Sequence, residues 1–86
     1  MAEVLVLARV LPESTEIKID ELEKKIKEEI APQKIEREPI AFGLVALKVS
    51  KIIPEEEGRM KELEEKLKRI EGISQVDILE VSRVFG

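Results

Sequence analysis

The order in which strand-like and helix-like apolar patterns follow one another is the feature of this sequence that most limits its possible folds. The run VLVLARVL, rich in β-forming residues, predicts a strand from Val4 to Leu11 with both faces partly covered. After Pro12, apolar residues recur at the spacing of one helical stripe, at Ile19, Leu22, Ile26 and Ile30. Asp20 and Glu23 fit a capping box at the start of this predicted helix, and Pro32 closes it. The chain is therefore predicted to begin with a strand followed by a helix.

A similar succession of patterns continues through the rest of the chain. The segment from Gln33 to Glu38 predicts a short edge strand, and the apolar run from Leu44 to Ile53 predicts a central strand. A second helical stripe follows, at Met60, Leu63, Leu67 and Ile70. Gly72 fits the position just past the end of that helix. The final run, from Ser74 to Phe85, alternates enough to predict a fourth strand.

The resulting order of strand, helix, strand, strand, helix, strand predicts an α+β fold. Its most economical arrangement is a ferredoxin-like βαββαβ sandwich, a four-stranded antiparallel sheet with two helices on one face. A chain of 86 residues has the length of one domain, so residues 1–86 are expected to form a single unit. The opposite sheet face would carry no helix and would be available to a partner or to a second copy of the chain.

Composition removes most kinds of enzyme chemistry. The sequence contains no Cys, His, Trp, Tyr or Asn, and therefore no thiol or imidazole nucleophile and no soft metal ligand. An acylphosphatase-type site needs an Asn, and a metal-carrying ferredoxin-like module needs a Cys pair. The cluster of Glu55, Glu56 and Glu57 is more typical of the acidic start of a helix than of a metal site. We expect a protein that is not an enzyme and that holds no metal or cofactor of its own.

Charge and aromatic content argue against nucleic acid and membrane partners. Charged residues make up 40% of the chain with both signs interleaved, and the net charge is −4 without a basic block. The only aromatic residues are Phe42 and Phe85, so the base-stacking platform of an RNA-recognition domain is missing. No apolar run reaches about 18 residues, and we expect a soluble, cytoplasmic protein. The abundance of Glu and Lys is typical of proteins that work at high temperature.

The segment EPIAFGLVAL, from Glu38 to Leu47, is the one that a purely structural interpretation explains least well. It places Ile40 and Phe42 in a predicted turn, between Pro39 and Gly43, where polar residues are usual. Taken alone, the pattern slightly favours a Phe42 side chain that folds back to plug the end of the core. The other interpretation is an exposed aromatic anchor on a rigid loop, the kind of residue that dominates protein interfaces.

The stretch REPIAFGLVALKV, the terminal EVSRV and the whole order of elements closely resemble the archaeal elongation factor 1-beta family. This family is homologous to the catalytic C-terminal domain of the eukaryotic exchange factor. The resemblance implies a ferredoxin-like domain that binds the GTPase elongation factor 1-alpha and accelerates replacement of GDP by GTP. It also implies that Phe42, next to Ile40 and Gly43 in the turn that Pro39 opens, enters a pocket of the GTPase. That implication favours the anchor over the plug.

The same resemblance assigns a role to Arg83. Eukaryotic relatives use a penultimate Lys to disturb the bound Mg²⁺ and the nearby switch region, and Arg83 aligns with that Lys. The chain departs from the pattern in two ways, because Arg replaces Lys and because Val84, Phe85 and Gly86 follow it. Arg83 would either act on the same site by pairing with a carboxylate or phosphate, or be a solvated strand end.

Two other classes of function remain open on the sequence. A small regulatory or assembly module would dimerise or bind a ligand through the open sheet face, and it would be indifferent to Phe42→Ala. A ribosome- or RNA-associated sheet protein would bind RNA in a salt-sensitive way, against which the acidic balance of the chain argues.

Overall fold

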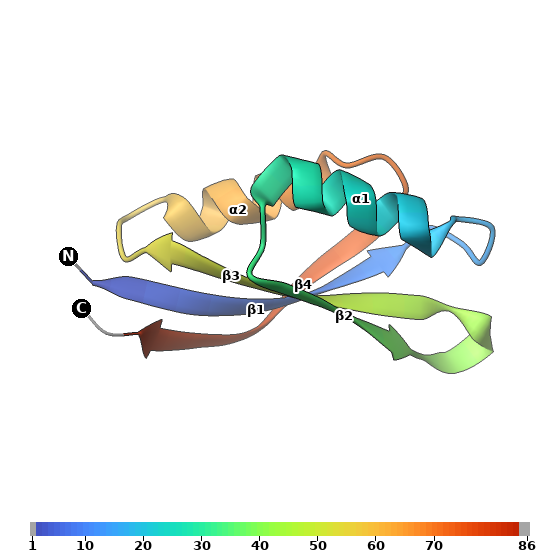
Figure 1. Cartoon of the computed structure of the whole chain (residues 1–86), viewed down its shortest axis with the longest axis horizontal. Helices are drawn as coiled ribbons and strands as arrows, with labels where there is room; N and C mark the ends of the chain where they lie inside the picture. Colours follow the sequence, from blue (N-terminus) through green and yellow to red (C-terminus); the bar gives the residue numbers. More distant parts are fainter. Residues whose placement is uncertain (1, 85–86) are drawn as a thin grey trace.

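Two helices lie on one face of a four-stranded antiparallel sheet in the computed structural model, which describes residues 2–84 (Figure 1). The sheet order is β2-β3-β1-β4, and each neighbouring pair is antiparallel. The elements are β1 (Glu3–Pro12), α1 (Ile19–Ile30), β2 (Lys34–Pro39), β3 (Val45–Pro54), α2 (Arg59–Lys68) and β4 (Ile73–Val84). The predicted ferredoxin-like fold is confirmed, with β3 and β1 in the centre and β2 at an edge. Phe85, which was predicted to continue the last strand, lies outside the described residues.

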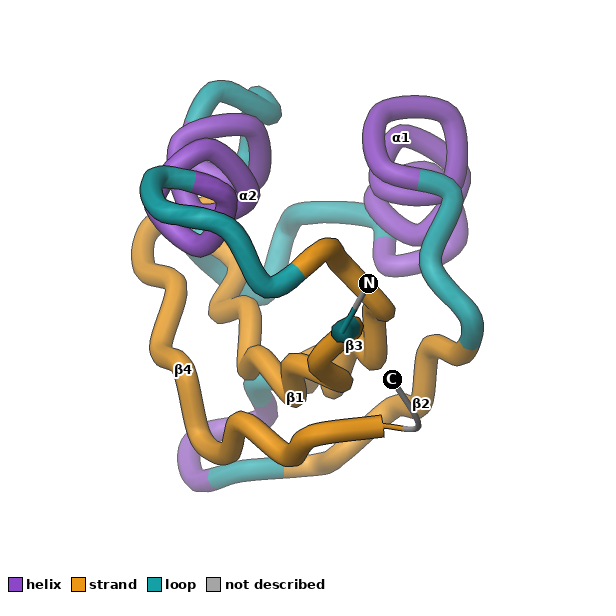
Figure 2. The backbone as a smooth tube through the Cα atoms, turned by 90° about the vertical axis from the view of Figure 1, so that its left-hand side faces the viewer, coloured by secondary structure: helices purple, strands orange, loops and turns teal. Residues whose placement is uncertain are grey.

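The core lies between the helices and the face of the sheet that they cover (Figure 2). Alternate residues of β1 point into it, and Val6, Ala8 and Val10 are almost completely buried. Both predicted helical stripes contribute, although Ile19 and Met60 are only partly buried. The buried helical residues are Leu22, Ile26, Ile30, Leu63 and Leu67, joined by Ile70 just past α2. The other face of the sheet carries no helix in the described part of the chain.

The predicted capping box at the start of α1 is wrong. The helix begins after Lys18 without a side-chain cap. Asp20 and Glu23 instead bind Arg37 of β2, whose Nη2 lies 2.8 Å from Glu23 Oε1. The hydrogen bonds that Arg37 donates, first to Glu23 and then to Asp20, raise the pKa of its guanidinium above the ordinary value. The carboxylates therefore tie the edge strand to α1.

The ends of α2 also differ from the sequence-based prediction. The helix ends at Lys68 with Arg69 as its cap, so Gly72 does not follow it directly. Gly72 instead has a φ of +99°, and its carbonyl accepts a hydrogen bond of 2.8 Å from the Glu13 N–H. At the other end, Glu55, Glu56 and Glu57 lie in the loop before the helix and not in its first turn. Gly72 thus shapes the loop between α2 and β4, which is hydrogen-bonded to the loop that follows β1.

Candidate partner-binding site

The β2–β3 turn is a single tight 3₁₀ turn closed by backbone hydrogen bonds. It spans Ala41–Gly43 and follows directly on the exposed end of β2 at Pro39. The Ile40 N–H donates to the Leu44 carbonyl at 2.8 Å, and the Leu44 N–H donates to the Ala41 carbonyl at 3.4 Å. Pro39, Ile40, Phe42 and Gly43, the four turn residues predicted to bind a partner, are therefore held together on one short loop.

Phe42 projects from this turn into solvent. Its side chain is 94% exposed, and its backbone is left-handed, with φ 63° and ψ 28°. A residue with a Cβ in this region costs roughly 1–2 kcal/mol, and such strain is most often found at functional sites. The plug interpretation of Phe42 is therefore wrong. An exposed ring on a strained but hydrogen-bonded turn has the geometry of an aromatic anchor.

Gly43 completes the turn in the same left-handed region, with a φ of +75°. We expect Gly43→Ala to lower the stability of the fold by about 1 kcal/mol and the melting temperature by about 4–8 °C, because a Cβ is disfavoured at this φ. Space is not the cause, since a Cβ here would meet only Thr15 Cγ2 at 3.8 Å. Thermal unfolding followed by circular dichroism measures the change. Gly43→Asn is the control, because Asn tolerates the left-handed region and should melt between the two. Equal melting of both variants would contradict the backbone explanation.

Arg83 lies at the far end of β4, paired across the sheet with Val4. Because Val4 is buried under the helices, Arg83 starts from the same sheet face. Its Nη2 lies 2.5 Å from Glu55 Oε1, and the side chains of Arg83 and Glu55 are 71% and 38% exposed. The hydrogen bond that Arg83 donates to Glu55 raises the pKa of Arg83. Arg83 is thus a paired cation with most of its surface open, and not simply a solvated strand end.

The structure does not bring Arg83 and the turn together. In β1, Val10 pairs with Leu47 and Val4 pairs with Arg83. At about 3.3 Å per residue, Val4 and Val10 lie about 20 Å apart along the strand, and so do their partners. The β2–β3 turn lies still farther along, so this turn and the end of β4 lie at opposite ends of a molecule whose longest extent is 42 Å (Figure 1). A partner that touches both must contact an extended surface.

The uncovered sheet face carries a row of charges that the sequence did not reveal. Lys48 Nζ lies 2.8 Å from Glu38 Oε2, and Arg9 lies between Glu38 at 3.9 Å and Asp77 at 3.8 Å. The hydrogen bond that Lys48 donates to Glu38 raises the pKa of Lys48. Lys51 belongs to the other face, where its Nζ donates to the Ala31 carbonyl at 3.1 Å. Their odd spacing along β3 puts the two lysines on opposite faces of the sheet, but which face each one takes was not fixed by the sequence.

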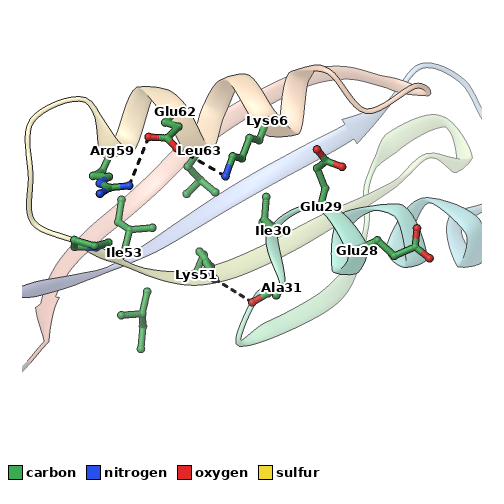
Figure 3. A pocket seen from close by; sticks show the side chains of 12 residues that line it. Glu28, Glu29, Ile30, Ala31, Lys51, Ile53, Arg59, Glu62, Leu63 and Lys66 are labelled. Carbon is green, nitrogen blue, oxygen red and sulfur yellow. Dashed lines mark hydrogen bonds and ion pairs between the residues drawn. The ribbon is translucent and has the colours of Figure 1, made fainter.

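A cavity of about 370 Å³ opens between the end of α1, the start of α2 and the end of β3 (Figure 3). Ile30, Ile53 and Leu63 give it apolar walls. Three of the charges at its rim interact with one another, since Glu62 lies 3.8 Å from both Arg59 and Lys66. None of the residues predicted to bind a partner lines it, so it is separate from the candidate site.

Within residues 2–84, no group of three or more metal-ligating side chains is placed to hold an ion. No helix in the same range is both long and apolar enough to cross a bilayer. The candidate site therefore consists of the turn at one end and the Arg83–Glu55 pair at the other.

Comparison with known proteins gives one consistent result. Residues 5–84 match the family described as the EF-1 guanine nucleotide exchange domain. The protein named Elongation factor 1-beta from Thermofilum pendens is 46% identical over 91 residues, covering 100% of both chains. Its namesake from Methanothermobacter thermautotrophicus is 40% identical over 89 residues, covering 99% of this chain and 100% of its own. That from Hyperthermus butylicus is 45% identical over 89 residues, covering 98% and 97%. The matched range includes both ends of the candidate site.

Proposed function

The chain belongs to the EF-1 guanine nucleotide exchange domain family, and we propose that it promotes replacement of GDP by GTP on the GTPase elongation factor 1-alpha during translation elongation. The observation that carries this proposal is the family match over almost the whole folded unit. The proposal takes residues 1–86 as one exchange-factor domain. It also takes Pro39, Ile40, Phe42, Gly43 and Arg83 as contacts with the GTPase.

Nucleotide exchange asks for no bond chemistry from the factor, which suits a chain without a thiol or imidazole nucleophile. An exchange protein that binds the nucleotide-free or distorted GTPase more tightly than the GDP-bound form must, by linkage, weaken the affinity of the GTPase for GDP to the same extent. Accelerating GDP release a thousandfold requires about 4 kcal/mol of such preference. Mg²⁺ would belong to the GTPase and its nucleotide. The factor therefore acts as a binding protein and not as an enzyme.

The two ends of the molecule supply different kinds of contact to this proposal. The Phe42 ring is an exposed apolar group of the kind that anchors an interface, and it is presented without rearrangement by the hydrogen-bonded turn. Arg83 is a fixed positive charge that suits a carboxylate or phosphate of the partner. Since the ends are far apart, the anchor would hold the complex while Arg83 acts at a separate place on the GTPase.

Release of a fluorescent GDP analogue from elongation factor 1-alpha tests the proposed function. We expect the wild-type chain to accelerate release at least tenfold at saturating concentration, because each factor of ten needs only about 1.4 kcal/mol of differential binding. The same chain unfolded by heat and refolded serves as a control for contaminating activity. An unchanged release rate would refute the exchange function. Sedimentation would then test whether the open sheet face pairs two copies of the chain.

A further inference from the structure

The residue that holds Arg83 comes from a different part of the chain and reaches it through the sheet. Val4 of β1 pairs with Ile53 of β3 on one side and with Arg83 of β4 on the other. Glu55 follows the end of β3 directly, and this brings its carboxylate to 2.5 Å from Arg83 Nη2. The pair is therefore set by strand register and not by closeness in sequence.

The loop that carries Glu55 is itself braced. The Glu55 N–H donates to the Ala2 carbonyl at 3.0 Å, and the Glu56 N–H donates to the Pro54 carbonyl at 2.9 Å. The Glu56 carboxylate accepts a hydrogen bond of 3.0 Å from Arg59 Nε at the start of α2. These bonds brace the backbone on both sides of Glu55, from which its carboxylate reaches Arg83.

A contribution to the stability of the fold does not explain why Arg83 and Glu55 form an ion pair. Ion pairs between exposed side chains contribute little, because solvent screens them and because two long side chains must be ordered. The Arg83 side chain is 71% exposed, and only its Nη2 is bonded to Glu55. A guanidinium has five N–H donors, so most of them remain directed to other partners. What the contact does supply is a defined direction for an otherwise flexible side chain.

We propose that Glu55 is a positioning residue for nucleotide exchange, which orders the Arg83 guanidinium at the end of the sheet so that its remaining donors meet the GTPase. This inference rests on the proposed function and on the contact assigned there to Arg83. A side chain ordered in advance loses less conformational entropy when it makes its contact. Because the anchor for binding lies at the other end, the benefit falls on the exchange step and not on initial binding.

The test compares Glu55→Gln with Glu57→Gln in the assay of GDP release. Both changes remove one negative charge from the same loop, but within the described residues no ion pair involves Glu57. We expect Glu55→Gln to lower the maximal release rate up to about fivefold, because an exposed ion pair can order Arg83 by no more than the free energy that the pair itself is worth. The concentration of factor giving half the maximal rate should change less than about twofold. Glu57→Gln should match the wild type, and Glu55→Asp should lie between the wild type and Glu55→Gln.

A double-mutant cycle with Arg83→Ala separates positioning from direct contact. If Glu55 acts through Arg83, Glu55→Gln lowers the rate in the wild-type background and has no further effect in Arg83→Ala. An equal loss in both backgrounds, a rate raised by Glu55→Gln, or an Arg83→Ala variant as active as the wild type would each overturn the inference while leaving exchange intact. A wild-type chain that fails to accelerate release would instead refute the proposed function itself. Circular dichroism confirms that each surface variant is folded.

Discussion

Replacement of Phe42 by alanine is expected to weaken binding of the chain to elongation factor 1-alpha about a hundredfold while leaving its folded structure intact. A buried aromatic anchor at an interface is commonly worth 2 kcal/mol or more, and a hundredfold change in affinity corresponds to about 2.7 kcal/mol. The fold should be indifferent, because the ring is 94% exposed and makes no part of the core. The measurement is the concentration of factor that gives half-maximal GDP release, together with thermal unfolding of the variant.

Leu79→Ala is the matched control for this prediction. Leu79 is another large apolar residue at the surface, and it is 42% exposed. It lies on β4 where the register against β1 shifts, between the partners of Leu7 and Ala8. Its removal should change half-maximal release less than about twofold, because most interface and surface truncations are near neutral. Equal loss in both variants would show a general dependence on surface hydrophobicity. Unchanged activity of Phe42→Ala would remove the turn from the proposed interface.

The two ends of the site predict different kinetic defects. Loss of Phe42 should raise the concentration of factor needed, because the ring contributes to every bound state alike. Loss of the Arg83–Glu55 pair should lower the maximal rate, because the contact of the ordered Arg83 with the GTPase is proposed to act on the exchange step and not on initial binding. The distance between the ends makes these effects nearly independent, so the corresponding free energies should add in a double variant of Phe42 and Glu55.

Periodicity in the sequence was sufficient to predict the architecture. The strand alternation of Val4 to Leu11 and the two helical stripes can each be satisfied only by burying one face, and one sheet with two helices buries all of them. The resemblance to the elongation factor 1-beta family is confirmed by the family match and by relatives that align along nearly the full chain. Both results rest on patterns that extend over many residues.

Predictions of local details were wrong where a tertiary contact outweighed a local preference. Asp20 and Glu23 of α1 have the spacing of a capping box. The guanidinium of Arg37, on strand β2, offers both carboxylates a charged partner instead. Gly72 fits a helix end by spacing, yet α2 stops earlier. A short motif reports only which local bonds are available, and a distant partner can replace them.

The candidate site shows the same limit more sharply. The turn from Pro39 to Gly43 could be recognised as unusual, but whether its ring points inward or outward depends on a left-handed Phe42 that composition does not determine. The partner of Arg83 was invisible, since Glu55 reaches it only through the register of two strands against β1. The roles of these residues in binding stay predictions until the GTPase assay is made.

A core truncation should produce the opposite pattern to Phe42→Ala. Leu67 lies on α2, is 0% exposed and packs against the sheet. Leu67→Ala is expected to lower the free energy of unfolding by about 3 kcal/mol, from lost burial and the cavity left behind. For a domain of this size that corresponds to a melting temperature lower by about 12–24 °C. Differential scanning calorimetry and chemical denaturation both measure the change.

The control makes the same chemical change on the surface. Leu79→Ala should alter the free energy of unfolding by less than about 0.5 kcal/mol, so a similar loss in both variants would contradict the assignment of the core. Below its melting temperature, Leu67→Ala should still accelerate GDP release like the wild type, because Leu67 is buried between α2 and the sheet and lies away from the turn. Phe42→Ala should melt like the wild type and bind poorly. This crossed result would separate the residues that build the domain from those that engage the GTPase.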